Sequence, residues 1–367
     1  MIYLDNAATS LPKPLAVERA VLEAMRSMAS VGRGSHAPAM RAAETVLDCR
    51  EAAAELFHVP DPERVVFTMN ATHALNIAIR SLVHSGDRVV VSGFEHNAVT
   101  RPLHALGAEI SVAGRSLFDR KTVLREFASA LSGARAAVCT QVSNVFGFAL
   151  PIKEIAELCK QYRVPLIVDA SQAAGMLPVD LAGWGAAFVA MPGHKGLFGP
   201  QGTGLLLCGQ EGEPLFYGGS GSNSRLQTMP PDLPDRLEAG THNVCGIAGL
   251  LAGIRFVQEK GSNAILRHER ECLRFFVQEL EGSGLELFTG TDQTGVLSLR
   301  CPTMDGETLA QRLAERGVCV RSGLHCAPLA HESAGTLETG TVRFSFSPFV
   351  EERQLREAAA ILRSLCA

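Results

Sequence analysis

The chain has 367 residues, of which 46% are hydrophobic, so it is long enough for about two domains with a sizeable core. A net charge of −4 without a basic stripe excludes nucleic acid as an expected partner. No apolar stretch is long enough to cross a bilayer and no secretory leader opens the chain, so we expect a cytoplasmic protein with no membrane contact.

Seven apolar runs of strand length alternate with helical patterns, at residues 64–69, 87–93, 109–114, 136–142, 164–171, 186–193 and 203–209. This alternation predicts an α/β fold in which helices cover both faces of a mostly parallel, seven-stranded sheet. Ligands of such sheets bind at the carboxyl ends of the strands. The polar residues that follow these runs are therefore the candidates for function.

The second half of the chain has a different pattern. Residues 218–235 are rich in Gly, Ser and Pro over a length too great for an ordinary connection, which indicates a functional loop. Helical patterns at 243–260 and 263–282 precede a mixture of short strands and helices that is typical of a smaller α+β domain. The expected domains are a large one at 15–245 and a small one formed by 1–14 and 246–367.

Cys326 lies between the last two predicted strands, in the sequence RSGLHCAPLAH at 321–331. Neighbouring arginine and histidine side chains favour the reactive thiolate form of a cysteine, so Cys326 is a candidate nucleophile. Three other roles stay open: a buried structural thiol, half of a disulfide, or a metal ligand beside His325 and His331. The ten cysteines include no C-x-x-C pair, which indicates neither a disulfide framework nor a zinc ribbon.

Two charged residues follow predicted strands. Asp169 could cap a helix, bind Mg²⁺ or pair with a cationic cofactor ring, but the chain lacks the phosphate loop that the Mg²⁺ interpretation needs. Lys195 lies in a glycine-rich turn between two apolar strands. It is either a solvated surface lysine or a desolvated amine of the kind that forms Schiff bases. A dinucleotide-binding fold is excluded, because no G-x-G-x-x-G opens a helix after the first strand.

Three further strand ends complete the pattern. The backbone amides of Ala71 and Thr72 begin a helix and are placed to bind a phosphate, with Thr72 as a simple N-cap being the alternative. His96 and Asn144 follow two more strands on the same rim of the sheet; singly, each would be an ordinary loop residue. A phosphate site, an acid for a ring nitrogen, an imidazole to stack and a Schiff-base lysine are together the requirements of pyridoxal phosphate.

At these residues the sequence resembles the fold-type I, class V aminotransferase superfamily, and within it the cysteine desulfurases and selenocysteine lyases. The resemblance covers nearly the whole chain. Its motifs are YLDNAATSLPKP at 3–14, GRGSH at 32–36, VDASQAAG at 168–175, GHKGLFGPQGTG at 193–204, RLEAGTHN at 236–243, RSGLHCA at 321–327 and TVRFSFSP at 341–348.

The resemblance implies a role for each candidate residue. Lys195 carries pyridoxal 5′-phosphate, Asp169 binds the pyridine nitrogen, Gln172 the ring hydroxyl, and His96 stacks on the ring. The phosphate ligands it implies are Ala71, Thr72 and His194, with Thr241 from the other subunit of a homodimer. The substrate-binding residues it implies are Ala8, His36, Asn144, Arg321 and Arg343. No metal is expected.

Cys326 falls where these enzymes keep their sulfur-accepting cysteine. The family mechanism implies that its thiolate attacks the sulfur of L-cysteine to give L-alanine and an enzyme persulfide, with His96 moving the thiol proton. Arg343 follows Cys326 by only 17 positions, and this short loop resembles the desulfurases that pass sulfur to a small acceptor protein. Two departures from the family pattern are Pro192, where a serine that binds the phosphate is common, and His73, where an acid is frequent.

Other functions fit parts of the same pattern. A selenocysteine lyase, or another β-eliminating relative in which Cys326 is a bystander, would share the cofactor residues. A non-catalytic redox or metal-binding protein would use Cys326, His325 and His331. It would leave Lys195 and Asp169 unexplained.

Overall fold

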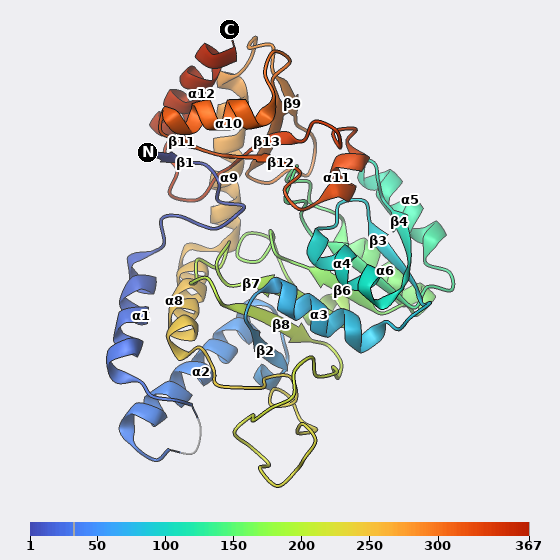
Figure 1. Ribbon diagram of the computed structural model, residues 1–367, viewed down its shortest axis with the longest axis vertical. Helices are drawn as coiled ribbons and strands as arrows, with labels where there is room; N and C mark the ends of the chain where they lie inside the picture. The colour runs from blue at the N-terminus through green and yellow to red at the C-terminus, as the bar shows by residue number, and fades with distance from the viewer. Residues whose placement is uncertain (32–33, 367) are drawn as a thin grey trace.

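The computed structural model describes residues 1–31 and 34–366, so the first two positions of the GRGSH motif lie outside the described residues. Its centre is a seven-stranded sheet with the strand order β2-β8-β7-β6-β5-β3-β4 (Figure 1). These strands are β2 (Val65–Thr68), β3 (Arg88–Ser92), β4 (Glu109–Ala113), β5 (Ala136–Thr140), β6 (Leu166–Asp169), β7 (Phe188–Pro192) and β8 (Gly204–Cys208). β8 runs in the direction opposite to the other six strands of this sheet, which confirms the mostly parallel sheet predicted from the sequence.

Helices cover both faces of this sheet. The face with α3 (Ala71–Leu82) and α4 (Asn97–Leu106) forms one hydrophobic cluster. The helices that contribute to the cluster on the opposite face are α2 (Ala37–Leu56), α5 (Arg120–Ala130), α6 (Ile152–Tyr162), α7 (Leu181–Trp184) and α8 (Val244–Lys260). A further helix, α1 (Leu15–Ser27), packs against α8.

The central strands are apolar at nearly every position because both of their faces are buried. Along β6, Leu166 and Val168 belong to one cluster, whereas Ile167 between them belongs to the other. Successive side chains of a strand point to opposite faces, so a continuous apolar run is what a sheet covered on both sides requires.

A second, antiparallel sheet has the order β12-β13-β10-β9. Its strands are β9 (Glu286–Phe288), β10 (Val296–Arg300), β12 (Arg321–Gly323) and β13 (Thr341–Ser345). Beside it, β1 (Ile2–Tyr3) pairs with β11 (Val318–Cys319), so the beginning of the chain packs with its last third (Figure 1). The helices of this region are α9 (Ser262–Glu279), α10 (Gly306–Glu315), α11 (Pro328–Ser333) and α12 (Glu352–Cys366).

One short 3-10 helix (Pro62–Arg64) precedes β2, and residues 209–243, which include the predicted functional loop, contain neither helix nor strand.

The strand order reverses between β3 and β5. From β3 the chain moves outward to β4, and it then returns to β5 and continues through β6 and β7 in the other direction. Open α/β sheets bind their ligands at such a switch point, outside the carboxyl ends of the strands. His96 follows β3 and Asn144 follows β5, so the fold places both residues beside this crevice.

Candidate active site

A cavity opens at this edge of the sheet, in the position where open α/β sheets bind their ligands. Eight of the residues that line it were predicted from the sequence: Ala71, Thr72, His96, Asn144, Asp169, Gln172, His194 and Lys195. Pro192 lines it as well. The segments that follow five strands therefore converge on one cavity, as the carboxyl-end rule predicts.

The turn that carries Lys195 is pressed against the segment after β6. A Cβ on Gly175, whose φ is +91°, would lie 2.1 Å from the carbonyl oxygen of Gly196, and a Cβ on Gly196 would lie 2.3 Å from that of Ala174. Only glycines permit this close approach of the two backbones. Burial lowers the pKa of Lys195 to about 8, and Asp169 opposes the shift. Lys195 is half-buried and lines the cavity, so it is not a fully solvated surface lysine.

The beginning of the chain supports this turn from the other side. The backbone carbonyl of His194 accepts hydrogen bonds from Ser10 Oγ at 3.1 Å and from Lys13 Nζ at 3.0 Å, and His194 Nδ1 lies 3.1 Å from Thr9 Oγ1. Burial lowers the pKa of His194 to about 4, so the imidazole is neutral at pH 7. A neutral His194 can still donate one N–H to an anion in the cavity.

Two polar residues on one stretch after β6 face the cavity. Asp169 is buried, and its Oδ1 accepts a hydrogen bond from the backbone N–H of Ser171 at 2.9 Å. Gln172 donates from Nε2 to the carbonyl of Ala7 at 2.9 Å, which fixes the direction of its side chain and leaves its Oε1 as an acceptor. The acid and the amide therefore keep fixed positions in the wall of the cavity.

The N-terminus of α3 offers unpaired backbone donors to the cavity. The side chain of Asn70 caps this helix by accepting from the N–H of His73 at 2.9 Å. The alternative of Thr72 as the N-cap is wrong, and Asn70 takes that role because the helix begins at Ala71. The amides of Ala71 and Thr72 belong to the first turn, where a helix has no acceptor of its own for them.

His96 is the N-cap of α4, and its Nδ1 accepts a hydrogen bond from the backbone N–H of Ala98 at 3.0 Å. Nδ1 is therefore unprotonated, and the ring hydrogen is on Nε2. Burial lowers the pKa of His96 to about 4, with the charge of Asp169 acting in the opposite direction. At neutral pH His96 is thus a hydrogen-bond donor at Nε2, which is suited to stabilise an anion rather than to accept a proton.

Cys326 is exposed, and its backbone is tied to the cavity residues. Its carbonyl accepts a hydrogen bond from the backbone N–H of Asn97 at 2.7 Å, next to His96. The carbonyl of His325 accepts from Nδ2 of Asn144 at 2.8 Å. Cys326 is a free thiol, which excludes the buried and disulfide alternatives in this structure, and no group of three potential metal ligands occurs among residues 1–31 and 34–366.

Arg343 is the largest fully buried side chain of the chain's described part, and its guanidinium has two partners. It donates to Asp5 Oδ1 at 2.7 Å and to the carbonyl of Asn144 at 3.0 Å. Arg321 lies directly opposite Arg343 on the neighbouring strand and is exposed. Asp5 was not predicted as a site residue, although an acid that directly follows an apolar strand was a visible signal.

Of the five expected substrate residues, only Asn144 is among the described residues that line the cavity of Lys195; Arg321 and Arg343 are not, and two more lie elsewhere. His36 is exposed and caps α2, where its Nδ1 accepts from the N–H of Ala39 at 3.4 Å. Ala8 is half-buried in the turn after Asp5. Neither is among the described residues that line the cavity of Lys195.

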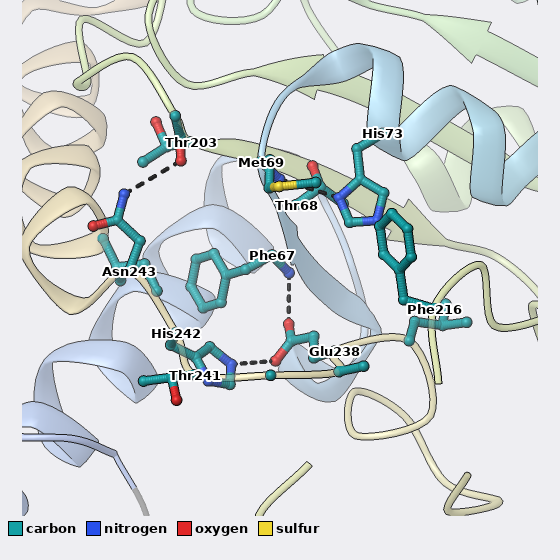
Figure 2. A pocket seen from close by; sticks show the side chains of 15 residues that line it. Phe67, Thr68, Met69, His73, Thr203, Phe216, Glu238, Thr241, His242 and Asn243 are labelled. Atoms are coloured by element: carbon teal, nitrogen blue, oxygen red, sulfur yellow. Dashed lines mark hydrogen bonds and ion pairs between the residues drawn. The ribbon is translucent and has the colours of Figure 1, made fainter. Parts of the chain in front are cut away.

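Thr241 lines a different cavity, which Figure 2 shows. In that view Glu238 lies between Phe67 and His242, and it accepts hydrogen bonds from Phe67 N at 2.6 Å and from His242 Nε2 at 2.6 Å. Arg50 adds a bidentate ion pair to the same carboxylate. This buried network fixes the segment that carries Thr241.

His73, one of the two departures from the family pattern, lines the same cavity as Thr241. It packs there against Phe216, with 5.1 Å between the ring centroids.

Pyridoxal 5′-phosphate fits the residues of the first cavity. Its aldehyde requires an amine with a low pKa, which Lys195 in the cavity wall supplies. Its phosphate requires donors such as the first-turn amides at Ala71 and Thr72. Its ring nitrogen requires a carboxylate, and Asp169 lies in the same wall. An α/β sheet with this donor set at its switch point defines the class of pyridoxal-phosphate enzymes.

Comparison with known proteins agrees with this class. The family model described as aminotransferase class-V matches residues 2–357. A probable cysteine desulfurase of Methanothermobacter thermautotrophicus is 35% identical over 362 residues, which cover 94% of this chain and 89% of the relative. The chain belongs to the class-V aminotransferase family, whose members depend on pyridoxal phosphate.

Solved structures give the same result. The apo cysteine desulfurase of Thermococcus onnurineus superposes with a TM-score of 0.91 at 28% identity, covering 100% of this chain and 94% of the other. The Escherichia coli cysteine desulfurase CsdA, in an S-sulfonic acid form, has a TM-score of 0.87 at 26% identity, with 100% and 95% covered. The fold expected from the sequence is therefore confirmed.

Among the residues described here, no helix is both long and apolar enough to cross a membrane.

Proposed function

We propose that the protein is an L-cysteine desulfurase in which Cys326 receives the sulfur as a persulfide. One observation carries this proposal. Asn144 lines the cavity of Lys195, and its side chain holds the turn of Cys326. This contact joins the wall of the cavity to the turn of the exposed thiol, which supports a site where one small amino acid reaches both Lys195 and Cys326.

The residues of the chain have separate tasks in this reaction. Arg343 and Asn144 bind and orient the carboxylate of the substrate, because a guanidinium offers paired donors to a carboxylate. Lys195 as a free amine removes the proton from Cα and later returns a proton to the product. Asp169 keeps the ring nitrogen of the cofactor protonated. When it is bound, pyridoxal phosphate supplies the electron sink for the negative charge at Cα.

Sulfur transfer follows at Cys326. The thiolate Sγ attacks the sulfur of the substrate, an S–S bond forms, and the bond between the substrate sulfur and Cβ breaks. The electron pair of that bond stays with carbon, which takes up a proton, so that cysteine and the enzyme thiol become alanine and the enzyme persulfide. His96 lines the cavity and carries its ring hydrogen on Nε2, so in this proposal it stabilises the thiolate by donating a hydrogen bond.

The assembly belongs to the same proposal. Thr241 does not line the cavity of its own Lys195, which supports its binding of the phosphate in the other subunit of a homodimer. A donor from the partner would also replace the hydroxyl that is missing at Pro192.

The domain division belongs to the proposal as well. The chain forms a large domain at 15–245 and a small domain at 1–14 and 246–367.

Delivery of the sulfur is the last part of the proposal. The exposure of Cys326 allows a protein acceptor to reach a persulfide there directly. The short connection from Cys326 to β13 supports the group of enzymes that use such an acceptor. Ten free thiols suit a reducing compartment, which supports a cytoplasmic location.

Product analysis tests the activity. The protein reconstituted with pyridoxal phosphate is incubated with L-cysteine and a thiol reductant, and alanine and sulfide are measured, with selenocysteine and cystine as competing substrates. We expect equal amounts of alanine and sulfide from L-cysteine. Alanine from selenocysteine alone would make the enzyme a selenocysteine lyase, and amine transfer to a keto acid without sulfide would make it an aminotransferase.

A further inference from the structure

The turn that presents Cys326 has an unusual backbone. His325 has a φ of +49° and Cys326 a φ of +57°, so two consecutive residues with side chains occupy the left-handed region. Each such residue costs of the order of 1 kcal/mol, and the conformation persists only where the surroundings impose it. Two hydrogen bonds hold the backbone of this turn: Asn144 Nδ2 donates to the carbonyl of His325, and Asn97 N donates to the carbonyl of Cys326.

The buried side chain of His325 also holds this turn in place. Only 3% of His325 is exposed, and its Nε2 lies 3.2 Å from the carbonyl oxygen of Thr341 and 3.3 Å from Thr341 Oγ1. A carbonyl accepts only, so Nε2 carries the hydrogen and donates it. Thr341 begins β13, the strand that carries Arg343. One hydrogen bond therefore connects the nucleophile turn to the strand of the proposed substrate arginine.

The other ring nitrogen of His325 makes no such contact. Nδ1 is buried and has no hydrogen-bond partner among the described residues. The ring stacks on that of His331, with 5.8 Å between the centroids and 27° between the planes, and His331 Nδ1 lies 2.7 Å from Thr336 Oγ1. Burial lowers the pKa of His325 to about 2 and that of His331 to about 4, so both rings are neutral and can pack together.

We infer that His325 is a positioning residue for Cys326: through Nε2 it anchors the left-handed turn to Thr341 and so fixes where the attacking sulfur stands. This inference rests on the proposed role of Cys326 as the sulfur acceptor. The side chain is not among the described residues that line the cavity of Lys195. Its loss should therefore slow the sulfur-transfer step and leave the binding of substrate and cofactor in place.

The two nitrogens of His325 permit a matched pair of variants. In His325→Gln the amide nitrogen takes the place of Nε2, whereas in His325→Asn it takes the place of Nδ1. Because only Nε2 has a partner, we expect His325→Gln to keep kcat within about threefold of the wild type and His325→Asn to lower kcat about tenfold or more. The KM for L-cysteine and the visible cofactor spectrum should stay unchanged in both.

Control variants distinguish the positioning role of His325 from a general effect of the substitutions on packing. The same pair of changes at His84, an exposed residue before β3 at the opposite edge of the sheet, should leave kcat unchanged. If His325→Asn does not fold, Thr341→Val removes the Oγ1 acceptor, together with its 3.1 Å contact to Ser298 Oγ, and should lower kcat about threefold. Equal losses in His325→Gln and His325→Asn, or a change confined to KM, would refute the inference.

The test also distinguishes the inference from the function on which it rests. If Cys326→Ala still releases sulfide from L-cysteine, the proposed role of Cys326 is wrong. If Cys326→Ala is inactive but the two His325 variants behave alike, only the positioning role is wrong.

Discussion

The buried Arg343 and the half-buried Asp5 form an ion pair that joins the beginning of the chain to its last strand. The guanidinium donates to Asp5 Oδ1 at 2.7 Å, and the two residues are 338 positions apart in the sequence. A backbone bridge between Asp5 and Ser345 lies beside this contact. The arginine that we assign to the substrate carboxylate therefore has a permanent carboxylate partner, which holds it in place before substrate arrives.

The first prediction concerns this pair. Asp5→Asn leaves the buried charge of Arg343 without its counterion, and breaking a buried pair in this way costs about 3–5 kcal/mol. We expect a decrease of about 3 kcal/mol in the free energy of unfolding, measured by urea denaturation of the apoprotein. Asp48→Asn is the control, because Asp48 and Arg255 form a similar pair at 2.9 Å that is exposed and should contribute less than about 1 kcal/mol. Equal effects of the two changes would contradict the prediction.

The second prediction concerns the pH dependence of cofactor loading. Reaction with an aldehyde requires the neutral form of Lys195, and burial lowers its pKa to about 8 from an ordinary value of 10.5. The neutral fraction rises about tenfold per pH unit below pH 8 and then becomes constant. We expect the rate at which the apoprotein gains a borohydride-reducible visible chromophore to follow this curve. A lysine peptide is the control for the ionisation of the cofactor itself, and a rate that still rises tenfold per unit above pH 9 would count against a desolvated amine.

The third prediction places Thr241 in the partner's site. In a mixed dimer of Lys195→Ala and Thr241→Ala subunits, the subunit that keeps Lys195 receives an intact Thr241 from its partner. Its site should therefore hold pyridoxal phosphate as firmly as the wild type does. In a mixed dimer of a Lys195→Ala/Thr241→Ala subunit with a wild-type subunit, the only lysine-bearing site receives Ala at position 241 and should lose cofactor more readily. Equal cofactor retention in the two dimers, measured by equilibrium dialysis, would show that Thr241 does not act across the interface.

The sequence was sufficient to predict the cavity because strand ends obey a simple rule. His96, Asp169 and Lys195 each follow an apolar run, and parallel strands bring their carboxyl ends to one edge. Thr241 could be assigned only by resemblance, since no local pattern says that its segment turns away from the cavity of its own chain.

The contacts that hold Cys326 and Arg343 were not predictable from local patterns. Asn144 reaches the carbonyl of His325 across 181 positions, and Asp5 reaches Arg343 across 338. Such pairs depend on how the beginning and the end of the chain pack against the large sheet. The sequence of a single strand or turn carries no information on that packing.

Mass spectrometry of the reconstituted enzyme, after one turnover with L-cysteine and no reductant, tests most directly whether Cys326 is the sulfur acceptor. We predict that the wild type gains one sulfur atom, on the peptide that contains Cys326, for each alanine released. Cys326→Ala should keep the cofactor chromophore and yield neither the added sulfur nor alanine. Alanine release at the wild-type rate from Cys326→Ala, or an added sulfur on another cysteine of the wild type, would contradict the assignment of Cys326 as the sulfur acceptor.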